Sequence, residues 1–204
     1  MPQGSGNWVE GKSVMEYQPS EITDNTGKIY ILQSARAENT AELTAFAEQA
    51  AGESLYFPWS REGCPGLWEN AAAYIDFFLT DPRYALLLLR DAENIVGLLE
   101  LNGFGSKPEY RHRCTLAPGL MKSYWGRGLV QSLWKAGEML AVSLGYEQAE
   151  AHVDSGNLPC RRAIEKNGWT LYGVLPKYCR YADGSCSDKY MYVKRLTESA
   201  DEPG

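Results

Sequence analysis

Two glycines with one residue between them follow a pair of aromatic residues. After them, apolar residues recur at the spacing of a helix. The glycines are Gly126 and Gly128, in the segment KSYWGRGLVQSLW at residues 122–134. The first turn of a helix exposes unpaired N–H groups that carry roughly half a positive charge, and a glycine lets an anion approach the backbone closely. A helix that begins near Gly128 would therefore offer a site for a phosphate group. The alternative is a turn that only joins a strand to a helix.

The spacing around these glycines excludes two other phosphate-binding motifs. A P-loop needs the pattern GxxxxGK[ST], and a dinucleotide-binding fold needs GxGxxG. Neither pattern is present at Gly126 and Gly128. Because the GxG motif alone does not identify a ligand, the elements around it have to decide the interpretation.

The spacing of apolar residues predicts strands and helices over most of the chain. Strands are predicted at residues 28–35, at 84–104 as two strands about a turn at 91–94, and at 111–121, 148–155, 169–181 and 187–196. Helices are predicted at residues 39–52, 67–82, 128–144 and 157–168. Asn39 or Thr40 would cap the first helix and Asn157 the last, while Gly145 and Gly168 would end the last two. The order of strand, GxG, helix, strand, short helix and hairpin is distinctive.

Composition and charge narrow the class of protein. A chain of 204 residues, 44% of them hydrophobic, is long enough for one domain with its own core. The net charge of −6 argues against a nucleic-acid binder, because phosphate contacts need a basic face. No run of about 18 apolar residues could span a membrane, and the first residues lack the apolar centre of a signal peptide. Five cysteines without CxxC spacing predict a reducing, cytoplasmic location, with no disulfide framework and no metal site.

The two ends of the chain differ in composition from its middle. In residues 1–27 the apolar residues do not recur at the regular spacing of a strand or helix. This predicts an N-terminal extension that is flexible or loosely docked. Residues 28–196 contain the predicted elements and form a single α/β domain. Residues 197–204 are polar and acidic, and are predicted to form a C-terminal tail.

Three motifs in this order resemble the GNAT superfamily of acetyl-CoA-dependent N-acetyltransferases, and within it the branch of ribosomal-protein alanine and polyamine acetyltransferases. The segment YWGRGL resembles the signature loop of that branch, with Gly128 as the central glycine, Trp125 in place of Gln or Arg, and Val130 in place of Gly or Ala. The segment NLPCRRAIEKNGW resembles the next helix block, with Cys160 where Ser is usual. The segment YADGSCSDKYMY resembles the closing hairpin. The resemblance covers residues 28–196.

The resemblance implies a single-domain GNAT-like fold, with a mixed, mostly antiparallel twisted sheet flanked by helices. The two central strands, at residues 112–121 and 148–154, would run parallel and splay apart. Acetyl-CoA would be the co-substrate, with its pantetheine arm in the wedge between these strands. A strand that has lost its neighbour offers unpaired N–H and C=O groups, which suits the amides of pantetheine.

The resemblance also assigns residues to acetyl-CoA. Leu120 and Met121 would pair with the pantetheine amides at the strand end. Asn157 and Cys160 would face the same arm from the other side, although a helix cap is the alternative role for Asn157. The pyrophosphate would lie against the loop and helix start, formed by Ser123, Tyr124, Trp125, Gly126, Arg127, Gly128, Leu129 and Val130.

Acetyl transfer also needs a base, because an amine of pKa about 10 is protonated at pH 7 and cannot attack a thioester. The resemblance places this role at His152, five residues before Asn157, and imidazole suits proton transfer near neutral pH. Glu100 is a second candidate, as a carboxylate inside the apolar strand IVGLLEL, where burial would raise its pKa. A solvent-facing side chain is the alternative for both residues. His112, on the strand that enters the motif, is a third candidate.

An acid for the departing thiolate is predicted at Tyr181, in the closing hairpin. The Tyr that many members of the family use corresponds to Ile164 here. Cys160 would lie near the thioester, but direct transfer is the usual route in the family. A packing or hydrogen-bonding role is therefore predicted for this cysteine.

Two functions stay open from the sequence. The first is an acetyltransferase that moves an acetyl group directly to a primary amine of a small molecule or of a peptide or protein N-terminus. The second is a non-catalytic module that binds acyl-CoA, which the residues Trp125, Val130 and Ile164 favour. The loop at residues 53–68 would wall the acceptor pocket with Tyr56, Phe57, Trp59 and Trp68. No nucleic-acid or membrane partner is predicted, and a homodimer is left open.

Overall fold

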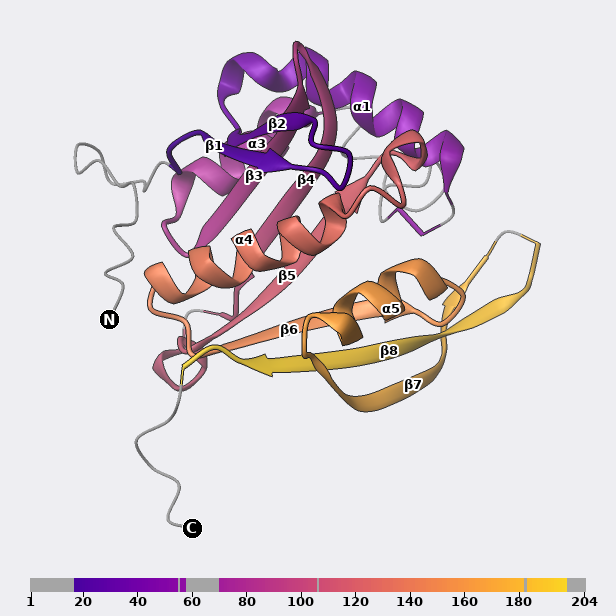
Figure 1. Cartoon of the computed structure of the whole chain (residues 1–204). Helices are drawn as coiled ribbons and strands as arrows, with labels where there is room; N and C mark the ends of the chain where they lie inside the picture. The colour runs from indigo at the N-terminus through magenta and orange to yellow at the C-terminus, as the bar shows by residue number, and fades with distance from the viewer. Residues whose placement is uncertain (1–16, 55, 58–69, 106, 182, 198–204) are drawn as a thin grey trace. The chain divides into compact units, whose positions relative to one another are not determined.

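The computed structural model describes residues 17–54, 56–57, 70–105, 107–181 and 183–197 (Figure 1). These residues fold into two compact units. The first contains the described parts of Met1–Glu100 together with Gly119–Leu129, and the second those of Leu101–Pro118 and Val130–Gly204. Within these ranges, no helix is long and apolar enough to cross a membrane.

The first unit contains the N-terminal strands and two helices. Its strands are β1 (Ser20–Thr23), β2 (Ile29–Ser34), β3 (Tyr84–Asp91) and β4 (Asn94–Gly103), the last of which ends in the second unit. The pairs β1–β2 and β2–β3 are antiparallel. Its helices are α1 (Thr40–Glu53) and α3 (Ala71–Thr80), with short 3-10 turns at Ala37–Asn39 and Lys122–Tyr124. Both helices and the strands β3 and β4 contribute to one buried core, which includes Leu43, Phe46, Ile75, Phe78, Leu88 and Leu98.

The second unit contains a parallel pair of strands and an antiparallel hairpin. Its elements are β5 (Arg113–Leu120), α4 (Leu129–Ser143), β6 (Gln148–Asp154), α5 (Leu158–Lys166), β7 (Thr170–Arg180) and β8 (Cys186–Arg195), although the end of β5 and the start of α4 belong to the first unit. A short 3-10 turn at Pro108–Tyr110 precedes β5. Strands β5 and β6 pair parallel, whereas β6–β8 and β7–β8 pair antiparallel. Along the whole chain the strands hydrogen-bond in the order β1-β2-β3-β4-β5-β6-β8-β7.

The mixed, mostly antiparallel α/β fold predicted from the sequence is confirmed. The predicted strands and helices are present, with ends that differ by a few residues. One strand was not predicted, because β1 has only four residues and is too short for an alternating pattern to be recognised. It lies within the predicted N-terminal extension and pairs with β2 from Ser20↔Leu32 to Thr23↔Ile29. The domain boundaries themselves stay a prediction.

Two glycines let β4 and β5 approach each other closely in the first unit. A Cβ atom on Gly97 would lie 2.8 Å from the Gly119 carbonyl oxygen and 2.9 Å from Cδ1 of Leu120. A Cβ atom on Gly119 would lie 2.6 Å from Cζ of the buried Phe57 ring. The end of β5, from which the GxG loop starts, is therefore fixed by contacts that leave no room for a methyl group.

Replacing Gly97 with Ala should destabilise the first unit by about 1–3 kcal/mol. The new methyl group would overlap a backbone carbonyl, which cannot rotate away as a flexible side chain could. Urea denaturation followed by tryptophan fluorescence measures the change. The matched control is Gly52→Ala in α1, where a Cβ meets nothing within 4 Å and Ala is the better helix former. Equal stability of the two variants would contradict the close approach of β4 and β5.

Candidate functional site

The two glycines of the GxG motif lie in the turn between β5 and α4. Gly126 has a φ of 76° and Gly128 a φ of 82°, in the left-handed region that strains any residue with a side chain. A Cβ atom on either glycine would meet no other atom within 4 Å. The space over both glycines is therefore open, and the backbone conformation is what requires glycine. Because α4 begins at Leu129, its unpaired N–H groups follow this turn directly.

The other predicted loop residues differ in how far they are exposed. Ser123 is exposed, Val130 is half-buried and Leu129 is buried. Leu129 packs its side chain inward, so only its backbone could meet a ligand. These positions are compatible with the predicted pyrophosphate contacts, which stay a prediction.

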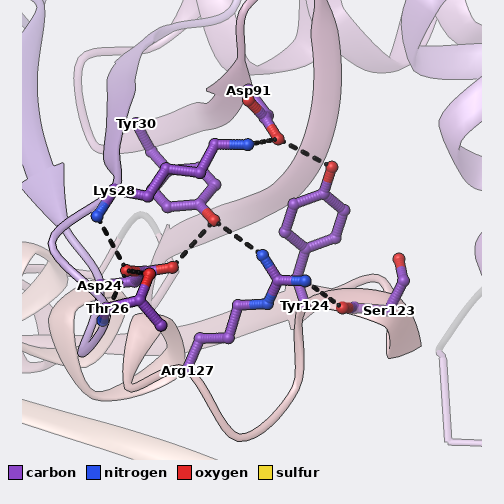
Figure 2. A network of polar contacts seen from close by, with 8 residues as sticks. All are labelled: Asp24, Thr26, Lys28, Tyr30, Asp91, Ser123, Tyr124 and Arg127. Atoms are coloured by element: carbon purple, nitrogen blue, oxygen red, sulfur yellow. Dashed lines mark hydrogen bonds and ion pairs between the residues drawn. The ribbon is translucent and has the colours of Figure 1, made fainter.

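The Asp24 carboxylate fixes the turn between β1 and β2, beside the GxG loop (Figure 2). It accepts hydrogen bonds from the Thr26 N–H (2.8 Å), the Thr26 hydroxyl (2.6 Å), the Lys28 N–H (3.0 Å) and the Tyr30 hydroxyl (3.0 Å). These bonds, led by that of the Thr26 hydroxyl, lower the pKa of Asp24 to about 2, although burial acts in the opposite direction. The carboxylate therefore stabilises the turn at pH values above its ordinary pKa of 3.8, and this contribution is lost as the pH falls towards 2.

The side chain of Arg127, between the two glycines, folds back onto the protein. Its guanidinium donates to the Tyr30 hydroxyl (3.2 Å) and to the Ser123 carbonyl (3.1 Å). It also lies over the ring of Tyr124, 4.9 Å from the ring centroid. Arg127 therefore fixes the shape of the loop, and any contribution of its charge to a bound anion would act from this position.

Tyr124 connects the same loop to the hairpin between β3 and β4. Its hydroxyl donates to the Asp91 carboxylate (3.0 Å), and Asp91 also forms an ion pair with Lys28 (2.5 Å). The hydrogen bond from Lys28 is the main cause that lowers the pKa of Asp91, and the same bond raises the pKa of Lys28. Asp91 and Lys28 were not predicted from the sequence, because both are far from the loop in the chain.

Backbone groups at the end of β5 that were predicted to meet pantetheine already have partners. The Leu120 carbonyl accepts from Nε1 of Trp125 (2.8 Å), and the Met121 N–H donates to the Val96 carbonyl (3.0 Å). The Met121 carbonyl accepts from the Tyr124 N–H (3.0 Å). The expectation of unpaired groups therefore fails for these three atoms, and a ligand could use the two carbonyls only as a second hydrogen-bonding partner.

In the second unit, the parallel strands β5 and β6 are paired over part of their length. Residues Arg113–Thr115 pair with Gln148–Glu150, whereas β5 continues to Leu120 and β6 to Asp154. The predicted parallel direction is confirmed. Among the described residues, the paired stretch ends before either strand does, as a splayed pair requires.

Glu150, on β6, is buried and 3% exposed. Its carboxylate accepts from Nε and Nη2 of Arg113 (2.7 and 2.5 Å), from the Gln148 amide (3.0 Å) and from the Tyr172 hydroxyl (3.3 Å). A buried carboxylate is tolerated when it is paired and hydrogen-bonded in this way. Arg113 and Tyr172 lie far from Glu150 in the chain, so these partners have no local signal in the sequence.

Asp154, at the end of the same strand, is also buried. It forms a hydrogen bond with Tyr181, the residue predicted as the acid. It accepts hydrogen bonds from the Tyr181 hydroxyl (2.7 Å), from the Ser187 hydroxyl and from the Gly156 N–H (2.9 Å). The pKa of Tyr181 is raised, first by burial and then by the bond to Asp154, so the phenol keeps its proton at neutral pH. Tyr181 is thus a fixed hydrogen-bond donor in the second unit.

His152 lies between these two carboxylates on β6 and is exposed. Its pKa is lowered from the ordinary value of 6.5, mainly because the ring loses part of its hydration; Glu150 opposes this shift and Lys189 adds to it. The imidazole is therefore neutral at pH 7 and has a lone pair free to accept a proton. The ring is thus solvent-facing, as the alternative to a catalytic role expected, and the role of His152 as the base stays a prediction.

Asn157 acts as the cap of α5, since its side-chain oxygen accepts from the Cys160 N–H (3.2 Å). Cys160 is half-buried, and burial raises the pKa of its thiol to about 11. A thiol with such a pKa is a poor nucleophile at neutral pH, which favours the predicted packing role. Ile164, at the position of the family's usual Tyr, is fully buried in the core.

The two other predicted bases differ in their surroundings. Glu100 is half-buried on β4, and its carboxylate accepts from the Tyr74 hydroxyl of α3 (2.6 Å). His112 is exposed in the turn before β5, where its backbone carbonyl accepts from the N–H groups of Glu147 and Gln148. Glu100 is thus held by a partner, while the imidazole of His112 lies outside the strand on which it was predicted.

The predicted acceptor loop at residues 53–68 falls mostly outside the described residues. This includes Trp59 and Trp68. Tyr56 is exposed, and Phe57 is buried against Phe46 with ring centroids 5.7 Å apart. The role of this loop therefore stays a prediction.

Comparison with known proteins assigns the family. The family model described as an acetyltransferase (GNAT) domain matches residues 29–170, which is more than half of the chain. No curated protein matches the chain in sequence. The chain belongs to the GNAT acetyltransferase family, as the resemblance predicted, and it is thus an N-acetyltransferase with acetyl-CoA as its acetyl donor.

Solved structures support the same fold. The GNAT-family acetyltransferase from Streptococcus pneumoniae has a TM-score of 0.74 at 20% identity, covering 81% of this chain and 99% of that one. The phosphinothricin acetyltransferase from Sinorhizobium meliloti in complex with AcCoA has a TM-score of 0.73 at 16% identity, covering 90% and 94%. The ribosomal-protein-alanine N-acetyltransferase from Brucella melitensis has a TM-score of 0.70 at 18% identity, covering 80% and 98%. At these identities the likeness concerns the fold alone.

The raised thiol pKa values predict which cysteines react. At pH 8, iodoacetamide should label the exposed Cys186 at least about tenfold faster than Cys160, or than the buried Cys114, whose pKa is about 12. Peptide mass spectrometry at increasing reaction times measures the three rates. Equal labelling of Cys160 and Cys186 would restore Cys160 as a candidate nucleophile.

Proposed function

We propose that this protein transfers an acetyl group directly from acetyl-CoA to a primary amine, carried by a small molecule or by the N-terminus of a peptide or protein, in the cytoplasm. The observation that carries the proposal is the open turn at Gly126 and Gly128, which leads straight into the N-terminus of α4. A pyrophosphate placed there would meet backbone N–H groups and the positive end of the helix dipole. One neighbour in fold, from Sinorhizobium meliloti, is a complex with AcCoA.

His152 is the residue we propose as the base. The imidazole first takes a proton from the ammonium group and passes it to water. The neutral amine nitrogen then attacks the thioester carbonyl carbon, the carbon–sulfur bond breaks, and the second proton lost by the nitrogen goes to the imidazole. Its lowered pKa keeps the ring neutral at pH 7, so this proton can be accepted. The exposure of the ring allows the proton to pass on to water.

Tyr181 is the residue we propose as the acid. Its raised pKa keeps the phenolic proton in place at neutral pH, ready for the departing CoA thiolate. The thiolate becomes a thiol, and the phenol regains a proton from water. In the structure the phenolic proton is donated to Asp154, so the hydroxyl must exchange that bond for one to the sulfur before it protonates the thiolate. Glu100 is kept as the second candidate base, because its bond to Tyr74 does not prevent it from accepting a proton.

Binding at the glycine turn predicts two results. Acetyl-CoA should raise the melting temperature of the parent, since a ligand at a hundred times its Kd stabilises the folded state by about 2.7 kcal/mol. Gly128→Glu should abolish this shift, because a carboxylate then occupies the space proposed for the pyrophosphate. Differential scanning fluorimetry and calorimetric titration with CoA measure both effects.

Gly145→Glu is the matched control for this substitution. Gly145 also has a positive φ, of 83°, and open space around its Cβ position, but it lies beyond the other end of α4. The two variants should lose similar stability, and only Gly128→Glu should lose CoA. Tight CoA binding by Gly128→Glu would place the phosphate site elsewhere.

Removal of the imidazole tests the base. His152→Ala should lower kcat by about 10² to 10⁴ and leave CoA affinity unchanged, because a base acts in the transition state. For the parent, kcat/KM should rise with pH through an ionisation below 6.5, in line with the lowered pKa, and the variant should lack this step. The release of CoA thiol with a panel of amines, including a peptide with a free N-terminus, provides the assay.

His112→Ala is the control, since it removes an exposed imidazole that lies outside β5. It should keep the parent's turnover. A large loss in Glu100→Gln with little loss in His152→Ala would move the base to β4. CoA binding without thiol release from any amine would favour the non-catalytic acyl-CoA-binding module.

A further inference from the structure

One residue of the β1–β2 turn bonds two successive carbonyls of the GxG loop. The Asn25 N–H donates to the Arg127 carbonyl (2.9 Å), and Nδ2 of Asn25 donates to the Gly126 carbonyl (3.1 Å). Asn25 is about a hundred residues from the loop in the chain and precedes the residues 29–170 that match the family model. Its side chain and its backbone therefore act together on the loop.

These two bonds fix the direction of two N–H groups. In a trans peptide the C=O and the following N–H point in opposite directions, and the described residues contain no cis peptide bond. With the carbonyls of Gly126 and Arg127 turned towards Asn25, the N–H groups of Arg127 and Gly128 both point away from it. Two successive N–H groups that point the same way form a concavity suited to an anion.

The loop cannot hold this orientation by itself. Glycine occupies positive and negative φ almost equally, so the peptide planes on either side of Gly126 and Gly128 rotate at little cost. The turn that presents Asn25 is, in contrast, fixed by four hydrogen bonds to the Asp24 carboxylate. Arg127 adds a further link to this turn through Tyr30, as Figure 2 shows.

We infer that Asn25 is a positioning residue for acetyl-CoA: it turns the carbonyls of the GxG loop away, so that the N–H groups of Arg127 and Gly128 are oriented for the pyrophosphate before it binds. This inference rests on the proposed function, which places the pyrophosphate at the loop. Asn25 itself does not touch the ligand. Because Asn25 orders the loop beforehand, the loop loses less conformational entropy when acetyl-CoA binds.

Substitution of Asn25 by Asp tests the donor role. Asp has nearly the same shape, but it replaces the Nδ2 donor by an oxygen that repels the Gly126 carbonyl. The Kd for CoA should rise about tenfold, measured by calorimetric titration. Asn70→Asp is the matched control in the same unit, because Asn70 uses its oxygen as an acceptor for the Ala73 N–H and Asp keeps that bond. Asn70→Asp should bind CoA as the parent does.

A second variant removes the donor without adding a charge. Asn25→Ala keeps the backbone bond to Arg127 and loses only the bond to Gly126, so its Kd should rise about threefold. The larger loss in Asn25→Asp should shrink to that of Asn25→Ala at about 1 M salt, because salt screens charge repulsion but does not replace a hydrogen bond.

A spectroscopic measurement separates positioning from a general loss of stability. With ¹⁵N-glycine labelling, the free parent should give one sharp Gly128 amide resonance that moves when CoA is added. In free Asn25→Ala this resonance should broaden or split, because the peptide plane then samples more than one direction. An effect on stability alone would lower the melting temperature and leave the Gly128 resonance unchanged.

The outcomes distinguish this inference from the proposed function. Weaker CoA binding in both Asn25 variants, with a normal Asn70→Asp and no binding by Gly128→Glu, supports both. Parent-like CoA binding by Asn25→Asp and Asn25→Ala, while Gly128→Glu loses CoA, would overturn the positioning role and leave the phosphate site in place. CoA binding by Gly128→Glu would falsify the loop as the phosphate site, and the role of Asn25 with it.

Discussion

A turn that binds an anion with its N–H groups must satisfy its carbonyl groups on the opposite side, and this constraint organises the first unit. The carbonyls of Gly126 and Arg127 both find donors in Asn25, and the Ser123 carbonyl finds one in Arg127. The turn between β1 and β2 is therefore more than a connection between two strands. It is the element that completes the backbone hydrogen bonding of the loop, since an unpaired carbonyl would either cost free energy or turn towards the ligand.

The charges around this loop fit the binding of an anion by an acidic protein. Two carboxylates lie near the loop in the same network, and each is occupied by donors: Asp24 by the N–H groups and hydroxyls of its own turn, Asp91 by Lys28 and Tyr124. Arg127 lies alongside them on the ring of Tyr124. Each acidic group in this network is paired with a cation or with several donors. The network therefore presents little net negative field to a ligand, although the net charge of the whole chain is −6.

The parts of this arrangement that could be predicted are those with a local signal. Regular spacing of apolar residues predicted the strands and helices, and the two glycines predicted the turn before α4, because these features depend on neighbours in the chain. The role of Asn25 has no such signal, since its partners are about a hundred residues away. The same holds for Glu150, which reads as a surface residue in an alternating strand until Arg113 and Tyr172 are brought to it. The bonded state of the Leu120 carbonyl also depends on the fold of the following turn, where the indole of Trp125 reaches back.

The side chains on β6 differ in how far their proton-accepting atoms are occupied by hydrogen-bond donors. Glu150 is bound by a guanidinium and Asp154 by two hydroxyls, so both carboxylates are already occupied by hydrogen-bond donors. His152 lies between them in the strand, and partial loss of hydration lowers its pKa despite the nearby Glu150. The neutral imidazole therefore depends mainly on its partial burial, which outweighs the charge of Glu150, and this links the packing of the strand to its proposed chemistry.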